Sequence, residues 1–442
     1  MRATLGRALS YLSIPSLGGL RSFAIWLSLL FVFSVPWENA LQIGEFGRGT
    51  KVIGYVTFLV WGLAVVAHKR LRKLDGLQQA FFLFLIWNGL TLYWSVDPGA
   101  TLTAFKTYTE MFGLVLLFWD LYDREVLVKA ALQAYVLGAF VAAGSIIVNY
   151  FTAPPVRFPL HDRVSALGYQ VDGIALIVSI AGPAAWYLAA GPEAGGRPTL
   201  ARILNYAYIP VGVIAVAMTG TRGATLASIP TALLIVWSLR KLSAGKRVMA
   251  VAAVVVAIVM VIQFAPSGGL DRIGTAATLS EGDQGALSGR WSIWVESGQV
   301  FLERPVVGVG TDGHRAAIAH LRTQRSAYKK AEKEAHNTYI SILVETGLIG
   351  FSLFACVIVC LYKRVRSRHG WDLYYWTAQV AVLAIGAMSL SLEDSKSIWI
   401  MTSLAVASAA AARTQEARVP VESRPAERVR PALRPSPTPW FD

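Results

Sequence analysis

The chain has 442 residues, of which 55% are hydrophobic and only 15% charged, and its mean hydropathy is positive. Its apolar runs repeatedly reach the roughly 20 residues that cross a bilayer. These features exclude a water-soluble globular protein and indicate a polytopic membrane protein. The formal net charge of +14 lies mostly in short loops and in the C-terminal tail, so it gives no reason to expect nucleic acid as a partner.

The apolar runs predict an all-α fold with twelve transmembrane helices in residues 1–412. In chain order the predicted spans are 22–38, 52–67, 78–95, 101–119, 126–152, 168–190, 202–219, 222–240, 247–265, 337–362, 371–391 and 395–412. Only a tight turn at Gly220-Thr221 separates the seventh span from the eighth. Residues 413–442 are rich in Arg and Pro and have no hydrophobic period, which predicts a disordered cytoplasmic tail.

Lys and Arg collect on one side of this twelve-span order, which predicts cytoplasmic termini because the cytoplasmic side carries the excess of basic residues. The clusters are Arg2/Arg7/Arg21, Lys69/Arg70/Arg72/Lys73, Arg240/Lys241/Lys246/Arg247 and Lys363/Arg364/Arg366/Arg368. The acidic loop at 120–125 does not add to this bias.

One large insertion, 266–336, is expected on the non-cytoplasmic side between the ninth and tenth spans. Within it, 287–302 has the apolar spacing of an amphipathic helix, and its two tryptophans are typical of interfacial anchors. A glycine-rich turn at 308–313 follows, and then a basic stretch, 315–333, that is expected to be helical. The insertion is therefore predicted to cover one mouth of the bundle.

His336-Asn337 begins the tenth apolar run, and Gly347 and Gly350 follow within it. On a continuous helix both glycines fall beneath the imidazole, within about 40° of its direction. The pattern is that of a proton-transfer site at the membrane surface, or of a helix-packing stripe of small residues. Both interpretations remain open at this stage. Glu345 is half a turn out of phase with His336 and is excluded from the site unless the helix breaks.

Three arginines approach the same membrane face as His336 in the predicted topology: Arg163, Arg222 and Arg290. The fixed fork of donors in a guanidinium suits phosphate oxygens, which favours a diphosphate ligand where several arginines converge. The alternative for each arginine alone is a contact with a lipid headgroup or a nearby carboxylate.

Lys106 lies one turn before Glu110 in the fourth span, which predicts an intrahelical ion pair, because ionisable groups within a membrane usually pair or face a cavity. Lys106 is a further candidate for a phosphate contact. His314 and His320 are candidates to assist in binding an acceptor, although both are expected to face solvent.

The His336-Asn337 and Gly347-x-x-Gly350 pattern resembles the signature of the O-antigen ligase family. The resemblance extends to Trp94-Ser95-x-Asp97-Pro98, Thr221-Arg222-Gly223-Ala224, Gly289-Arg290-Trp291, Arg304-Pro305 and Gly308-x-Gly310. Asp172-Gly173-Ile174 departs from the Asp-Pro-Asn of many relatives, so no role is assigned to that segment.

The resemblance implies a GT-C-type glycosyltransferase of the bacterial inner membrane. Such an enzyme transfers a glycan from undecaprenyl diphosphate to a lipid A-core acceptor at the periplasmic face. A neutral imidazole at His336 suits the role of general base. Asn337 and the arginines suit a substrate-binding site, and the guanidinium groups can stabilise the leaving diphosphate. The sequence contains no Asp-x-Asp pair and no carboxylate nucleophile near His336, so the expected reaction is inverting and needs no metal or other cofactor.

Two sister activities, O-antigen polymerase and protein O-oligosaccharyltransferase, would use the same donor and differ only in the acceptor. The modest length of the chain and the lack of an extra domain after the last spans favour the ligase. A non-enzymatic transporter of lipid-linked glycan predicts charges through the whole depth of the bundle, whereas the charges here cluster at one end.

Overall fold

The computed structural model describes residues 19–42, 47–152, 157–158, 161–162, 164–191, 199–241, 286–325 and 335–418, with a few residues between 243 and 255. Its described part is helical except for two short antiparallel strands, β1 (Arg157–Phe158) and β2 (His161–Asp162), and the connecting loops. The predicted all-α class is therefore confirmed. Most of the 247–265 span and the tail beyond Arg418 lie outside the described residues.

A described helix coincides with each of the other predicted spans. The helices are α2 (Gly19–Ser34), η1 (Val35–Ala40), α3 (Gly49–His68), α4 (Gly76–Leu90), η3 (Thr91–Tyr93), α5 (Pro98–Leu121), α6 (Glu125–Thr152), α7 (Val171–Ala190), α8 (Leu200–Thr219), α9 (Arg222–Leu239), α12 (Ala286–Glu303), α13 (His314–Arg325), α14 (Thr338–Arg366), α15 (Gly370–Ala387) and α16 (Lys396–Arg418). Within the described residues, seven helical segments are long and apolar enough to cross a membrane. The chain is thus a multi-pass membrane protein.

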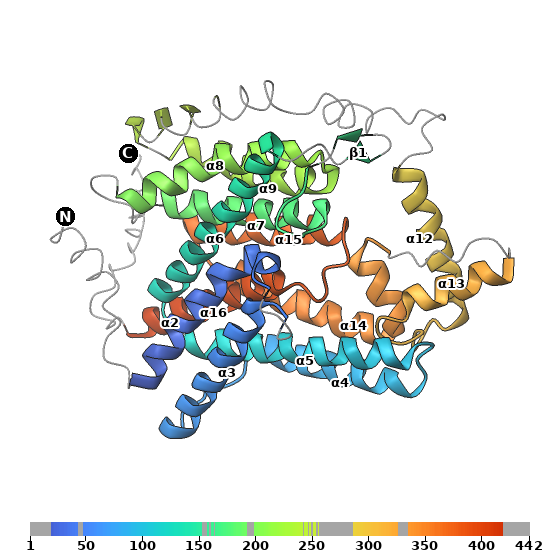
Figure 1. Ribbon diagram of the computed structural model, residues 1–442. Helices are drawn as coiled ribbons and strands as arrows, with labels where there is room; N and C mark the ends of the chain where they lie inside the picture. Colours follow the sequence, from blue (N-terminus) through green and yellow to red (C-terminus); the bar gives the residue numbers. More distant parts are fainter. Residues whose placement is uncertain are drawn as a thin grey trace, which may run out of the picture.

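Two groups of helices pack into one bundle (Figure 1). Helices α6, α7, α8, α9 and α15 form the first group, and α4, α5, α14 and α16 form the second. Helix α2 packs on α3 and α6, and α16 also contacts α6, so the two groups share one hydrophobic core. Helices α12 and α13 lie at the opposite end of the molecule from the start of α2 (Figure 1).

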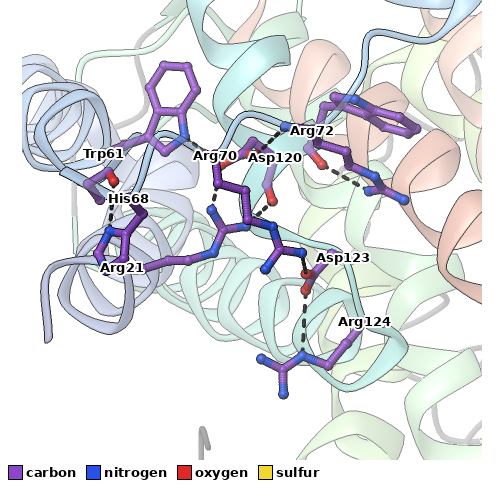
Figure 2. A network of polar contacts seen from close by, with 10 residues as sticks. Arg21, Trp61, His68, Arg70, Arg72, Asp120, Asp123 and Arg124 are labelled. Atoms are coloured by element: carbon purple, nitrogen blue, oxygen red, sulfur yellow. Dashed lines mark hydrogen bonds and ion pairs between the residues drawn. The ribbon is translucent and has the colours of Figure 1, made fainter. Parts of the chain in front are cut away.

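The basic loops meet at the α2 end of the bundle, and acidic residues join them there. Asp120 at the end of α5 accepts hydrogen bonds from Arg21 Nη1 (2.7 Å), Trp61 Nε1 (2.9 Å) and the backbone N–H of Arg72 (2.8 Å), as Figure 2 shows. Asp123 lies beside Arg70 and Arg124 in the same view. The acidic 120–125 loop therefore sits among basic residues as their counter-ion.

Helix α14 breaks at Gly347, whose φ of 66° and ψ of −170° are not helical. The segment after α12 satisfies the backbone groups that the break exposes: Leu348 N donates to Pro305 O (2.9 Å) and Gly310 N donates to Glu345 O (2.9 Å). The same segment bonds to the α4–α5 turn, where Val96 N donates to Val309 O (2.9 Å). The break thus joins the insertion to the bundle.

A second, smaller hydrophobic core holds the insertion together. It unites α12, α13 and the first half of α14 through Val300, Val309, Ala317, Ile318, Leu321 and Val344. The predicted amphipathic helix at 287–302 is confirmed as α12. The helix expected over 315–333 is confirmed as α13 up to Arg325, and its remainder lies outside the described residues.

Candidate functional site

His336 lies just before α14 rather than on it. Its φ of 48° is left-handed, and its residue is half-buried. Asn337 is the N-cap of α14, and its Oδ1 accepts from Tyr339 N (3.0 Å) and Ile340 N (3.2 Å). The expectation that His336 shares a helical face with Gly347 and Gly350 is therefore wrong, because the helix starts after the histidine and breaks at Gly347.

Contacts on both sides of His336 fix its backbone. Trp294 Nε1 of α12 donates to Ala335 O (3.0 Å). On the other side, the N–H and hydroxyl of Thr338 donate to Leu390 O in the α15–α16 loop, at 3.1 and 2.9 Å. Trp294 therefore does more than anchor the insertion: it ties α12 to the residue that precedes the histidine.

Arg290 of α12 lines a narrow cavity, which we call the arginine cavity. Its guanidinium lies 3.8 Å from Asp172 at the start of α7. The other lining residues are Leu176, Thr221, Gly223, Ala224, Gly386, Ser389 and Leu390. The cavity has a volume of about 10 Å³, which is room for about one water.

The start of α9 faces the arginine cavity, and Arg222 is the first residue of that helix. The predicted tight turn is confirmed, since α8 ends at Thr219 and Gly220 has a φ of 60°. Leu390 lines the cavity and also accepts the two hydrogen bonds from Thr338, two residues after His336. The structure thus brings Arg290, the α9 start and the His336 segment to one end of the bundle.

Two other predicted residues do not join them. Arg163 lies outside the described residues. Lys106 is exposed on α5 and lines neither the arginine cavity nor the larger one described next. The expected Lys106–Glu110 ion pair is wrong: Glu110 binds Lys51 of α3 (3.0 Å) and the hydroxyl of Tyr55 (2.7 Å) instead. The packing of α3 on α5 decides this partner.

A larger cavity, of about 280 Å³, opens beside the His336 segment, and we call it the acid-lined cavity. Its lining residues are Thr103, Ala104, Thr107, Tyr108, Thr311, Asp312, His314, Arg315, Ala335, Ser341, Glu345, Ser391, Glu393 and Asp394. Burial raises the pKa of the Glu393 carboxyl to about 7. Burial also lowers the pKa of the His314 imidazole to about 4.

Comparison with protein families identifies the middle of the chain. Residues 207–355 match the family model described as O-antigen ligase. This stretch is similar to that family, and we refer to it as the O-antigen ligase domain. A search of curated proteins gives no match to the chain. The O-antigen ligase domain contains Arg222, Arg290 and His336, and the resemblance found in the sequence is therefore confirmed.

Two glycines of the O-antigen ligase domain allow the close approach of backbone segments. A Cβ at Gly308, whose φ is 72°, would stand 2.3 Å from Glu345 O. A Cβ at Gly347 would stand 2.3 Å from Val306 O. Both distances are far inside van der Waals contact, so these motif positions serve the junction between insertion and bundle rather than a groove under the histidine.

Sequence reasoning missed three features of the site. The sequence assigns no role to Asp172, yet Asp172 pairs with Arg290. The sequence predicts a solvent-facing His314, yet only 2% of His314 is exposed. Helical phase excludes Glu345 from the site only if α14 is unbroken, and the helix breaks two residues after Glu345. Its position in the acid-lined cavity was not foreseeable from helical phase. Among the described residues, no group of three His, Cys, Asp or Glu side chains is placed to hold a metal ion.

Proposed function

We propose that the protein is a glycosyltransferase that moves a glycan from undecaprenyl diphosphate to a sugar hydroxyl of lipid A-core. The proposal includes a twelve-span, GT-C-type topology in the bacterial inner membrane, with the active site at the periplasmic face. The observation that carries it is the convergence of Arg290, the α9 start and the His336 segment, all of which belong to the O-antigen ligase domain.

The reaction forms one C–O bond and breaks another. The acceptor hydroxyl attacks the anomeric carbon of the donor while His336 takes its proton as general base. The bond between that carbon and the diphosphate oxygen breaks, and the electron pair leaves with the diphosphate. Guanidinium groups of Arg222 and Arg290 stabilise the developing charge, together with the positive end of α9. Attack opposite the leaving group inverts the anomeric centre.

The donor does not fit the arginine cavity as it stands, because a space for one water cannot hold a diphosphate. Arg290 must leave Asp172, or α12 must move. Within the described chain α12 packs mainly against α13 and α14, and the Arg290–Asp172 pair links it to α7. We therefore propose that the arginine cavity opens when the donor binds. Arg163, Asn337 and Lys106 are secondary candidates for substrate contacts.

The test uses purified full-length protein, lipid-linked glycan and two acceptors in parallel, lipid A-core and a pilin-like peptide, with and without EDTA. We expect lipid A-core to gain the glycan with EDTA present, and we expect NMR of the product to show an inverted anomeric centre. We expect His336→Ala to abolish transfer while folded protein remains, and Arg222→Ala and Arg290→Ala to weaken donor use severely. Arg124→Ala, on a loop at the other end of the bundle, is the matched control.

The outcomes separate the rivals. Glycosylated peptide would identify a protein O-oligosaccharyltransferase, and extension of one lipid-linked glycan by another would identify a polymerase. Movement of intact donor across a vesicle membrane without transfer would identify a transporter. Wild-type rates in His336→Ala would remove the general-base role, and loss of transfer with EDTA would remove the metal-independent reaction.

A further inference from the structure

The acid-lined cavity is a second site beside His336, with a chemistry opposite to that of the arginine cavity. Asp312, Glu345, Glu393 and Asp394 contribute four carboxyl groups to its lining, against one guanidinium. Its volume of about 280 Å³ is close to the lower end, about 300 Å³, of known small-molecule sites. A phosphate would meet repulsion in such a lining, so this cavity is unsuited to the diphosphate of the donor.

The lining of this cavity includes buried polar atoms that no other described residue hydrogen-bonds. Among the described residues, His314 Nδ1, Ser391 Oγ and Glu393 Oε2 are buried and have no hydrogen-bond partner. Only 2% of His314 is exposed. Buried polar atoms are rarely left without partners, because each one costs free energy of desolvation. A polar molecule in the cavity would satisfy them.

The contacts of His314 define which polar molecule fits. The hydroxyl of Ser297 donates to Ile293 O (2.7 Å), so its oxygen accepts from His314 Nε2–H (2.8 Å). An imidazole that is neutral and protonated on Nε2 presents a lone pair on Nδ1. His314 therefore offers the cavity an acceptor, and Glu393 Oε2 adds an oxygen acceptor when its carboxyl is ionised. A molecule that brings hydrogen-bond donors fits this lining.

Hydroxyl groups of a sugar meet this requirement, since each one brings a donor and no charge. Neighbouring residues of one loop line the two cavities. Leu390 lines the arginine cavity, the next residue, Ser391, lines the acid-lined one, and Ala335 in the latter directly precedes His336. A sugar held there lies against Ala335, the residue that precedes the proposed general base.

We propose that the acid-lined cavity binds a neutral sugar ring of the acceptor through its hydroxyl groups. The assignment to the acceptor rests on the proposed function, whereas the assignment to a sugar rests on the cavity alone. Phosphate and sugar thus bind at separate cavities, to which the α15–α16 loop contributes the neighbouring residues Leu390 and Ser391.

The test is saturation-transfer NMR on the full-length protein in detergent, with methyl α-glucopyranoside and methyl α-galactopyranoside as probes. We expect transfer to ring protons of at least one probe. Thr107→Trp fills the cavity from α5 and is expected to abolish the signal. Glu393→Gln keeps the shape and replaces one carboxyl oxygen by an amide NH2 that cannot accept a hydrogen bond, and it is expected to weaken binding about tenfold. Glu303→Gln changes an exposed acid outside the cavity and is the matched control.

Each outcome is decisive. Absence of transfer in the wild type, or an unchanged signal in Thr107→Trp, would overturn the sugar site. Binding of methyl glucosaminide but neither neutral glycoside would show an amine site instead, and competition by inorganic phosphate would show an anion site. Binding of undecaprenyl diphosphate, followed by native mass spectrometry, is expected to be equal in all variants.

Kinetics then separate this inference from the proposed function. In the transfer assay, Glu393→Gln is expected to raise the KM for lipid A-core about tenfold and leave the KM for the donor unchanged. A raised donor KM instead would assign the cavity to the donor glycan. Sugar binding without any transfer activity would keep the sugar site and remove the ligase function.

Discussion

His336 has an unusual backbone for a residue with a side chain. A left-handed φ at such a residue costs of the order of 1–3 kcal/mol and persists only where the surroundings impose it. Here the surroundings are the Trp294 hydrogen bond to Ala335 and the cap that Asn337 provides for α14. The backbone conformation of His336 is therefore set by α12, which is distant in the chain, and by the start of α14, which directly follows the histidine.

Asn337 offers a sharp test of what its side chain does. Because Oδ1 already caps α14, we expect Asn337→Asp to keep both stability and activity, since aspartate caps equally well. Asn337→Ala is expected to lose about 1 kcal/mol of helix stability. Thermal unfolding and transfer rates check both variants. Loss of activity in a stable Asn337→Asp protein would instead show that the amide Nδ2 donates to substrate.

His314 makes the stability of the insertion depend on pH. Its pKa is about 4 in the fold and about 6.5 when unfolded, so the unfolded state binds the extra proton between these values. The free energy of unfolding of α12–α13 is therefore expected to fall as the pH drops from about 6.5 to 4. Hydrogen exchange of α13 amides measures it. His314→Gln is expected to flatten the profile, and an unchanged profile would contradict this cause.

At the scale of elements, the break in α14 is a junction that depends on Gly347. Gly347→Ala places a side chain at a left-handed φ, which costs about 1–2 kcal/mol, and drives its Cβ into Val306 O. We expect a lower unfolding temperature and faster hydrogen exchange in α12 and α13.

Gly298→Ala is the matched control, because a Cβ there meets nothing within 4 Å and the residue lies within α12. We expect it to be neutral or stabilising by up to about 1 kcal/mol. Equal stability of the Gly347 and Gly298 variants would contradict the role of the junction.

The Asp120 network at the other end makes a second prediction for an element contact. Asp120 and Arg21 are both buried, so Asp120→Ala leaves a buried guanidinium without its counter-ion. Breaking such a pair costs about 3–5 kcal/mol. Asp123→Ala removes a more exposed partner of Arg70 and is expected to cost no more than about 1 kcal/mol. Unfolding in detergent measures the loss of stability in the two variants. Equal losses would contradict the larger contribution of the Asp120–Arg21 pair.

At the scale of the whole molecule, the two ends differ in charge and are predicted to face opposite sides of the membrane. Single cysteines at exposed Glu303 and exposed Lys73, in a background without Cys356 and Cys360, test this. We expect an impermeant maleimide to label Glu303→Cys in intact spheroplasts and Lys73→Cys only after permeabilisation. Labelling of both from one side would contradict the topology.

The sequence predicted the helices well because local hydropathy and length are enough to identify a membrane span. It also predicted α12 and the turn between α8 and α9, where apolar spacing and Gly220 are local signals. It failed where contacts join segments that are distant in the chain. Lys51 forms the ion pair with Glu110, Asp172 forms the ion pair with Arg290, and packing against α12 buries His314. Helical phase gave a wrong position for His336 relative to Gly347 and Gly350, because the phase calculation assumes one unbroken helix.

The two hydrophobic cores divide α14 between them, and this has a consequence for engineering. Before Gly347, Val344 packs with α12 and α13 while Ile342 packs with the bundle, and after Gly347 the buried apolar residues Val357, Leu361 and Val365 all pack with the bundle. A chimera that exchanges only the insertion up to His336 would cut through the smaller core. The natural crossover point is Gly347, so a transplant intended to change acceptor preference should carry 286–346 as one cassette.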